Sequence, residues 1–366
     1  MSSPSAAKAL AALALLGCAA LSAGCAAGYV TRAAYEEAKI LWRRQPIERM
    51  LEEPGLSATD KHKLRTVLEA RTFAEESLGL RVGGSFRTVS RIDSGAVVQL
   101  LIAARRDRLE AHTWWFPIVG RVPYKGFFSK KAAAASAAEL EHEGYDTYVR
   151  PAIAFSTLGW FGDPLPSVLL QRDEVTLAEV IFHELLHNTM FVPGEVTFDE
   201  SAATFTGYRA AIEFFCEHRD PASAECRQAV EDWQDILTIS RFLRASLAEL
   251  EKFYATRPAG ELLERGRQRA FAEIREQFRD LKLHPDRIAD FAAGPINNAS
   301  LLEQRVYLRD LDVFEELYRA HGGLRAALQA LRSAVDRGGD PFDRLYEAVS
   351  RTNPPEVAGA TAPPEG

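Results

Sequence analysis

Residues 181–187 read IFHELLH, and the interpretation of the whole chain starts from this stretch. Its two histidines, His183 and His187, are four positions apart, so on a helix both imidazoles lie on one face and can reach the same metal ion. The neighbouring residues are apolar almost all round the helix, which is typical of a buried segment. Buried histidines beside a carboxylate need a partner, so we predict a metal site on a helix over residues 176–191.

Glu184 follows the first of these histidines, and from there its carboxylate can reach a water on the metal without binding the metal itself. This pattern is typical of the helix of zinc metallopeptidases. Zinc lowers the pKa of a bound water and polarises a peptide carbonyl, while the glutamate accepts the water proton and passes it to the leaving amine. We therefore predict one zinc ion, with Glu184 as the general base. The alternative, a solvated glutamate between two surface histidines, disagrees with the apolar flanks.

A catalytic zinc ion needs a third protein ligand and an open fourth position. Residues 198–201 read FDES, and we expect them to open a helix over residues 200–216. We assign Glu200 as the third ligand and Asp199 as a helix cap or a residue that supports the ligands, and the reverse assignment stays open. His218 is a weaker candidate for the third ligand, because it lies a full helix further on, beside a predicted surface turn.

The composition describes a globular protein. The chain has 366 residues, of which 47% are hydrophobic and 26% charged, and this is enough apolar side chain for one large core or two smaller ones. Its 44 basic and 51 acidic residues give a net charge of -7, so the chain has no electrostatic footprint for nucleic acid. We therefore expect no nucleic-acid partner.

Hydrophobic periodicity predicts an α+β fold. A small mixed sheet is expected in the N-terminal half, from β-branched and aromatic runs at 85–89, 96–103, 113–122, 124–128 and 146–154. An Ala-rich helix over residues 130–143 is expected to cover one face of that sheet. The C-terminal half is expected to be helix-dominated, with helices over 176–191, 200–216, 226–254, 262–282, 298–321 and 324–336.

Five regions follow from these patterns. Residues 1–24 are expected to be a lipoprotein signal peptide, and residues 25–80 an N-terminal helical arm. A mixed α/β sheet region is expected over 81–160 and a helical metallopeptidase region over 161–350. Residues 351–366 are expected to form a disordered tail. The arm is expected to contain helices over residues 46–53 and 57–78. The tail is rich in proline, alanine and glycine and has little to bury.

The N-terminal stretch Ala9–Cys25 is almost entirely Ala, Leu, Gly and Ser, which suits an export peptide better than a membrane-spanning helix. Small residues before Cys25 resemble a bacterial lipobox, so we predict cleavage before Cys25 and a lipid on it. Cys18 is a rival site, and a plain anchor or buried helix is the alternative. The lipid would hold the chain on the periplasmic face of a membrane. Ala26 replaces the aspartate that retains some lipoproteins at the inner membrane, which favours the outer membrane.

Two cysteines remain outside the signal, Cys216 and Cys226, ten positions apart. In an oxidising compartment they can form a disulfide. Two separate thiols on helices are an equal alternative, because a single pair of cysteines gives no framework pattern.

Several motifs occur in an order that resembles the bacterial family known as putative aminopeptidases. They are the lipobox-like start, YKGFF at 124–128, STLGWF at 156–161, HELLH at 183–187, FDES at 198–201 and PINNA at 295–299. The resemblance spans residues 25–335 and implies a zincin-like metallopeptidase with a glutamate as third ligand, exported as a lipoprotein and acting on peptides. Asp199 stands where the family usually has asparagine, and this difference leaves the expected ligand, Glu200, unchanged.

Tyr307 is expected on a helix that Asn297 and Asn298 cap, and it is a weak candidate for donating to the oxyanion. A half-buried tyrosine without a catalytic role is the alternative. The function predicted is zinc-dependent peptide hydrolysis, as an aminopeptidase by resemblance. The alternatives are a non-catalytic zinc lipoprotein that binds a partner and a zinc amidase that acts on a non-protein amide.

Overall fold

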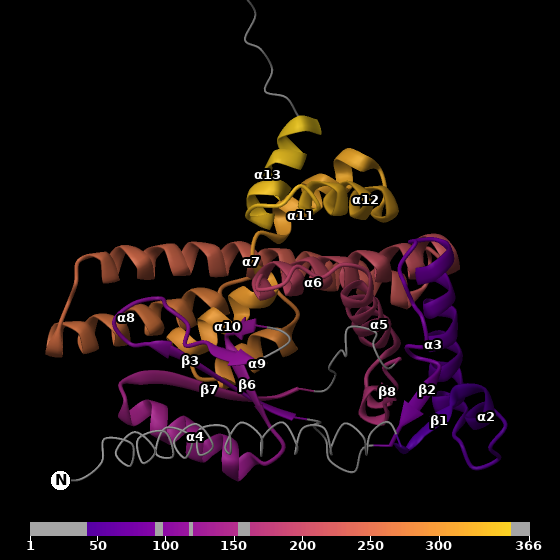
Figure 1. The fold of residues 1–366 in the computed structure, drawn as a ribbon, viewed down its shortest axis with the longest axis horizontal. Coiled ribbons are helices and arrows are strands. Elements are labelled where there is room, and N and C mark those ends of the chain that lie inside the picture. The colour runs from indigo at the N-terminus through magenta and orange to yellow at the C-terminus, as the bar shows by residue number, and fades with distance from the viewer. Residues whose placement is uncertain (1–41, 92–97, 117–119, 153–161, 353–366) are drawn as a thin grey trace, which may run out of the picture.

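A computed structural model describes residues 42–91, 98–116, 120–152 and 162–352. The predicted signal peptide with Cys18 and Cys25, the segment 156–161 and residues 353–366 of the predicted tail lie outside these ranges. Figure 1 shows the strands in the N-terminal half of the chain and mainly helices after them. This arrangement confirms the predicted α+β class, with small sheets in the N-terminal half and a helix-dominated C-terminal half.

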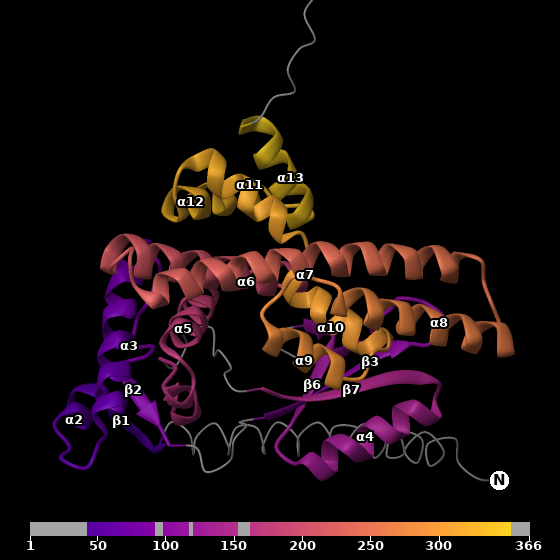
Figure 2. The same cartoon turned by 180° about the vertical axis from the view of Figure 1, so that it is seen from behind.

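The largest sheet has three strands in the order β6-β3-β7, which span Tyr124–Phe127, Val98–Arg105 and Tyr145–Ala152. β3 is antiparallel to both neighbours, so β6 and β7 run in the same direction. Helix α4 (Lys130–His142) makes the crossover between them. Both views show α4 on one face of the sheet and α10 (Asn298–Leu308) on the other (Figures 1 and 2). The prediction that an Ala-rich helix covers one face is therefore confirmed.

The two faces of β3 follow the two-residue period of a strand. Leu101 and Ala103 are fully buried against α4, where they form a small core of their own. Leu100 and Ile102 point to the opposite face and belong to the main core. The sheet thus separates a small apolar layer from the large core of the helical half.

Two smaller sheets complete the β structure of the described residues. One has the order β1-β2-β8, formed by Arg44–Pro46, Thr88–Ser90 and Leu165–Pro166, and the other pairs β4 (Trp114–Phe116) with β5 (Gly120–Val122). We expected one continuous strand over residues 113–122. The run folds back instead, so that Trp114 pairs with Val122. Gly120, the first residue of β5, has a φ of 75°, a conformation that residues with a Cβ rarely adopt.

Helix α5 (Glu174–Thr189) packs against α3 (Ala58–Glu76) and α6 (Val196–Ile212). α3 lies beside α5 in both views (Figures 1 and 2). It begins where the Ser57 hydroxyl accepts the Asp60 N–H, and its buried residues belong to the same core as α5. The described part of the predicted N-terminal arm, residues 42–80, is therefore packed into the main core.

Gly207 sets how closely α5 and α6 approach. A Cβ at this position would lie 2.7 Å from the carbonyl oxygen of Glu179 and 3.3 Å from the Cβ of His183. Only glycine lets the two backbones meet at this distance. The helix that carries the two histidines and the helix that carries Glu200 are thereby held face to face.

The other helices of the described residues lie around this pair or pack on its neighbours. They are α2 (Ile47–Leu51), a 3-10 helix (Ser167–Gln171), a π-helix (Glu213–Arg219), α7 (Ala224–Ala255), α8 (Gly260–Arg279), α9 (Pro285–Ala293), α11 (Leu311–His321), α12 (Leu324–Val335) and α13 (Pro341–Thr352). We expected one helix over residues 298–321. It is two, α10 and α11, because Asp310 adopts a left-handed φ of 53° between them. Helix α13 was not expected.

Within the residues that the structure describes, we find no helix that combines the length and the apolar character needed to span a membrane.

The π-helix and α7 are joined by a disulfide between Cys216 and Cys226. Of the two alternatives left open by the sequence, the structure thus has the bonded pair.

Candidate active site

Helix α5 presents the HELLH stretch with its apolar and polar faces separated. Asp173 caps the helix and accepts the N–H of Thr176 at 2.9 Å. Leu185 and Leu186 are at most 2% exposed and fill the core, whereas the side chains of His183 and His187 are 19% and 9% exposed and line a cavity. The four-residue spacing therefore puts both imidazoles at the cavity surface, as expected from the helical period.

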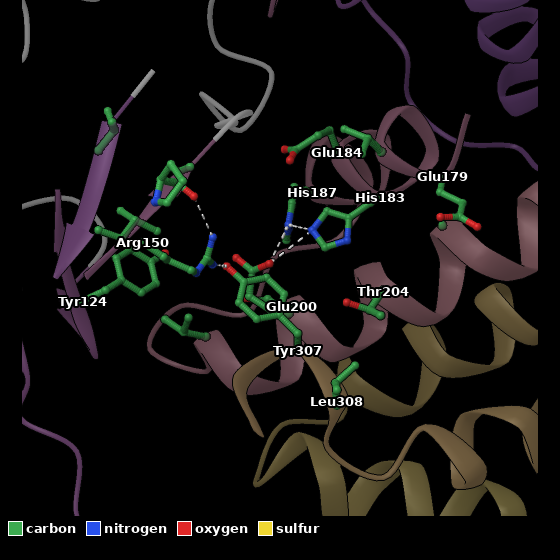
Figure 3. A pocket seen from close by; sticks show the side chains of 18 of the residues that line it. Tyr124, Arg150, Glu179, His183, Glu184, His187, Glu200, Thr204, Tyr307 and Leu308 are labelled. Atoms are coloured by element: carbon green, nitrogen blue, oxygen red, sulfur yellow. Dashed lines mark hydrogen bonds and ion pairs between the residues drawn. The ribbon is translucent and has the colours of Figure 1, made fainter. Parts of the chain in front are cut away.

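The ligand atoms of His183, His187 and Glu200 form a small triangle (Figure 3). The distances are 3.2 Å from His183 Nε2 to Glu200 Oε2, 3.3 Å between the two Nε2 atoms, and 3.6 Å from His187 Nε2 to Glu200 Oε2. Tetrahedral zinc with ligands at about 2.0–2.2 Å requires ligand atoms about 3.3–3.6 Å apart. The donor set and its spacing therefore fit zinc.

Electrostatics in this triangle favour a positive charge at its centre. Burial acts to lower the pKa of His187, but the Glu200 carboxylate outweighs it and raises that pKa to about 9. Burial acts to raise the pKa of Glu200, yet the two histidines hold it well below its usual value. A cation shared by these three side chains would replace the proton that His187 otherwise holds.

Glu184 lines the same cavity as the triangle, on the side of α5 away from Glu200 (Figure 3). Burial raises the pKa of Glu184, and the neighbouring His183 and His187 oppose that rise. A carboxylate with a raised pKa is a stronger base than a solvated one. Its position agrees with the role that the sequence predicts for it.

Asp199 is not the cap of the helix that carries Glu200. We expected that helix over residues 200–216, but α6 begins at Val196, and Glu195 is its N-cap residue. Asp199 lies in the first turn, where its Oδ1 accepts the Val192 N–H at 2.9 Å. Burial raises its pKa to about 7. Asp199 therefore ties the preceding loop to α6 and supports the position of Glu200.

Tyr307 lies on α10 with its ring 6.4 Å from that of His183, stacked at 27°. Its hydroxyl accepts a hydrogen bond from Arg150 Nη2 at 3.0 Å, and Arg150 also forms an ion pair with Glu303 at 2.5 Å. Burial raises the pKa of Tyr307 well above its usual value, so the phenol keeps its proton. The structure therefore brings this predicted residue to the triangle.

Arg150 was not expected at the site, and Tyr124 belongs to an aromatic cluster expected mostly in the sheet core, with a few members at the cleft; both line the cavity. In the register of the main sheet, Leu100 lies opposite Arg150 and Ile102 lies opposite Tyr124, so both polar side chains share the face turned toward the cavity. A signal existed, because Arg150 is the one basic residue within the strand run 146–154 and lies at its centre. Only the register shows which face it occupies.

His218, the weaker third-ligand candidate, is not brought to the triangle. It belongs to the π-helix, where it stacks on Phe214 with ring centroids 5.8 Å apart. Its Nε2 lies 3.8 Å from Glu69 Oε1, and its side chain is 46% exposed. Among the described residues, the group of side chains arranged so that they could hold a metal ion consists of His183, His187 and Glu200.

A cavity of about 920 Å³ surrounds these groups. Its wall on the sheet side is mainly apolar, with Val98, Leu100, Phe116, Val122 and Tyr124. Its opposite wall is formed by the facing surfaces of α5 and α6, including Glu179, Thr204 and Gly207. The volume suits a short peptide or a small molecule.

A family of proteins described as "Putative aminopeptidase" matches residues 28–338, most of the chain. The chain belongs to this family. No curated protein and no solved structure matches it significantly.

Membership in the family agrees with the resemblance found in the sequence motifs, and the matched range agrees with the predicted range of 25–335. The HELLH and FDES segments lie inside the match, as do the residues that the structure adds to the cavity wall. The family description indicates a peptidase with a peptide substrate.

Proposed function

We propose that this protein is a zinc-dependent peptidase, and that His183, His187 and Glu200 hold the ion in a zincin-like fold. The observation that carries the proposal is the triangle of ligand atoms beside Glu184, in a cavity large enough for a peptide. The group has three protein ligands among the described residues, the number found in catalytic zinc sites, whereas structural sites use four. This supports an enzyme rather than a protein with a structural zinc ion.

A bound zinc ion would supply Lewis acidity that activates water and polarises the scissile carbonyl. Glu184 takes the proton of the attacking water and delivers it to the leaving amine, as its raised pKa and its place in the cavity allow. Asp199 fixes the first turn of α6, so that Glu200 keeps its position during the reaction.

Tyr307 would stabilise the negative charge that develops on the carbonyl oxygen. Because Arg150 donates to the phenol oxygen, the proton of the phenol stays free to be donated into the cavity. Glu303 holds Arg150 in turn by an ion pair. A preorganised donor of this kind stabilises the transition state more than the substrate.

We also propose that the chain is exported and attached by a lipid on Cys25 to the periplasmic face of a membrane, with the outer membrane preferred. The disulfide between Cys216 and Cys226 supports an oxidising compartment. Mass spectrometry of the protein purified from membranes would detect a diacylglyceryl group on Cys25. A mature chain that begins elsewhere would contradict this part of the proposal.

Zinc content and peptide hydrolysis test the proposed function together. The full-length chain should contain one zinc ion, Glu200→Ala should contain little, and Glu184→Gln should keep the zinc but lose hydrolysis by about three orders of magnitude or more. Glu174→Gln is a matched control, because Glu174 lies on the same helix, bonded to Thr66 rather than to the cavity. A parent protein that binds no zinc, or a Glu184→Gln variant with normal activity, would refute the proposal.

A further inference from the structure

Glu179 is a buried carboxylate that the proposed mechanism does not use. It lies on α5, four residues before His183, is 8% exposed and lines the same cavity. Its Oε1 atom is fully buried and has no hydrogen-bond partner among the residues that the structure describes. A buried carboxylate normally has a cation or several donors beside it, so this one needs a partner that the described chain does not supply.

The basic group that acts on Glu179 is already paired with other carboxylates. Arg287 acts electrostatically on Glu179, but its guanidinium forms ion pairs with Asp232 and with Asp235, the latter at 3.3 Å. Asp232 adds negative charge near Glu179, and burial raises the pKa of Glu179 well above its usual value. This end of the cavity therefore has an excess of carboxylates over cations.

The position of Glu179 limits what the partner can be. Figure 3 shows Glu179 on one side of His183, and Arg150 and Tyr124 on the other. Residues four apart on a helix are separated by about 6 Å along its axis, slightly more than one turn. In a peptide with a free N-terminus, the amino nitrogen lies about 2.5 Å from the first carbonyl carbon. A charge-assisted hydrogen bond adds about 2.8 Å, and the total of about 5.3 Å is close to the rise between Glu179 and His183, as a terminal ammonium at Glu179 with its own carbonyl at the triangle requires.

We propose that Glu179 binds the free α-ammonium group of the substrate and so makes the protein an aminopeptidase. The inference rests on the proposed peptidase function and names its substrate class, peptides with an unmodified N-terminus. The ammonium supplies the cation that the buried carboxylate needs. The rest of the peptide extends past His183 toward the apolar wall formed by the sheet. N-acetylated peptides lack the charge and carry extra volume at this end.

Hydrolysis of two matched substrates tests the inference. Leucyl-p-nitroanilide and its N-acetyl derivative are compared with the zinc-loaded full-length protein and with Glu179→Gln, an isosteric change. The parent should prefer the free amine, and the variant should lose about 30- to 100-fold in kcat/KM on the free amine but little on the acetylated substrate. Equal rates of the parent on both substrates, or an unchanged preference in the variant, would overturn the inference.

Binding without turnover gives an independent result. The peptide Leu-Ala-Ala amide and its N-acetyl form are titrated by calorimetry into full-length Glu184→Gln and into Glu184→Gln with Glu179→Gln. The free amine should bind more tightly to the first protein only. If the zinc-loaded parent hydrolyses no peptide, the proposed function fails, and the titration alone then decides whether Glu179 recognises an ammonium group.

A stability measurement excludes a purely structural role. If Glu179 held the fold together, Glu179→Gln would lower the melting temperature. Because its Oε1 atom is buried without a hydrogen-bond partner among the described residues, the neutral amide should leave the melting temperature unchanged or raise it. Zinc content should equal that of the parent. Glu174→Gln again serves as the matched control, since Glu174 is hydrogen-bonded to Thr66 on α3. A variant with a lowered melting temperature and unchanged substrate preference would refute the inference.

Discussion

Substitution Gly207→Ala tests whether the contact between α5 and α6 holds the ligand triangle together. The new Cβ would lie 2.7 Å from the carbonyl oxygen of Glu179, where an ordinary contact begins at 3.4 Å. The helices must separate by about 0.7 Å, several times the ±0.2 Å within which metal–ligand distances are held. Because His183 lies on one helix and Glu200 on the other, that separation acts directly on the metal site.

The sign of the stability change shows whether the new Cβ of Gly207→Ala clashes with α5. Alanine has a higher helix propensity than glycine, so without a clash Gly207→Ala would stabilise the protein by about 1 kcal/mol. Overpacking costs about 1–3 kcal/mol in a well-packed interior. Backbone contacts cannot rotate away, so we expect the cost to be near the upper end and the net loss to be about 1–2 kcal/mol. We also expect zinc affinity to fall about tenfold or more.

Urea unfolding and competition with a zinc-binding dye measure the two effects on full-length protein. Gly266→Ala is the control. Gly266 lies on α8, and its new Cβ would lie 2.2 Å from the ring of Phe253 on α7. Since neither residue is a ligand, the control substitution should lower stability without changing zinc affinity. A Gly207→Ala variant as stable as the parent, with unchanged zinc affinity, would show that the close approach of α5 and α6 does not position the ligands.

Three further predictions concern the metal and the scaffold. Zinc at a thousand times its dissociation constant should stabilise the parent by about 4 kcal/mol and Glu200→Ala hardly at all. Thermal melting with and without zinc measures this difference, and an equal rise in melting temperature for both proteins would contradict the ligand assignment. Replacing Cys216 and Cys226 by serine should cost about 2.8 kcal/mol in urea unfolding, from the short loop that they close. Asp146→Ala leaves the guanidinium of Arg267, which is 4% exposed, without its carboxylate partner. The free energy of unfolding in urea should fall by about 3 kcal/mol or more, and a much smaller fall would contradict the prediction.

Local periodicity was enough to predict most elements. The helices around residues 57–78, 130–143 and 176–191 were expected from caps and apolar spacing, and they form close to those limits. Predictions failed where single residues leave the regular pattern. Asp310 divides one expected helix into two, and the strand expected over residues 113–122 is two antiparallel strands, the second beginning at Gly120. Both residues have a positive φ, which apolar spacing does not reveal.

By itself, the sequence determined the chemistry of the candidate site. The spacing of His183 and His187 fixes their common face, because an α-helix repeats every 3.6 residues wherever it is placed. The same local rule puts Glu184 beside them. Glu200 was assigned by its distance along the chain and by resemblance, since no local rule brings a second helix back onto the first.

Tertiary structure alone decided which distant residues share the cavity with these three. Arg150 faces Tyr307 because the register of β7 on β3 turns it toward α10, and α6 lies close to α5 because Gly207 leaves room for the carbonyl oxygen of Glu179. Strand register and helix contact depend on atoms far apart in the chain, so they follow only from the packed molecule.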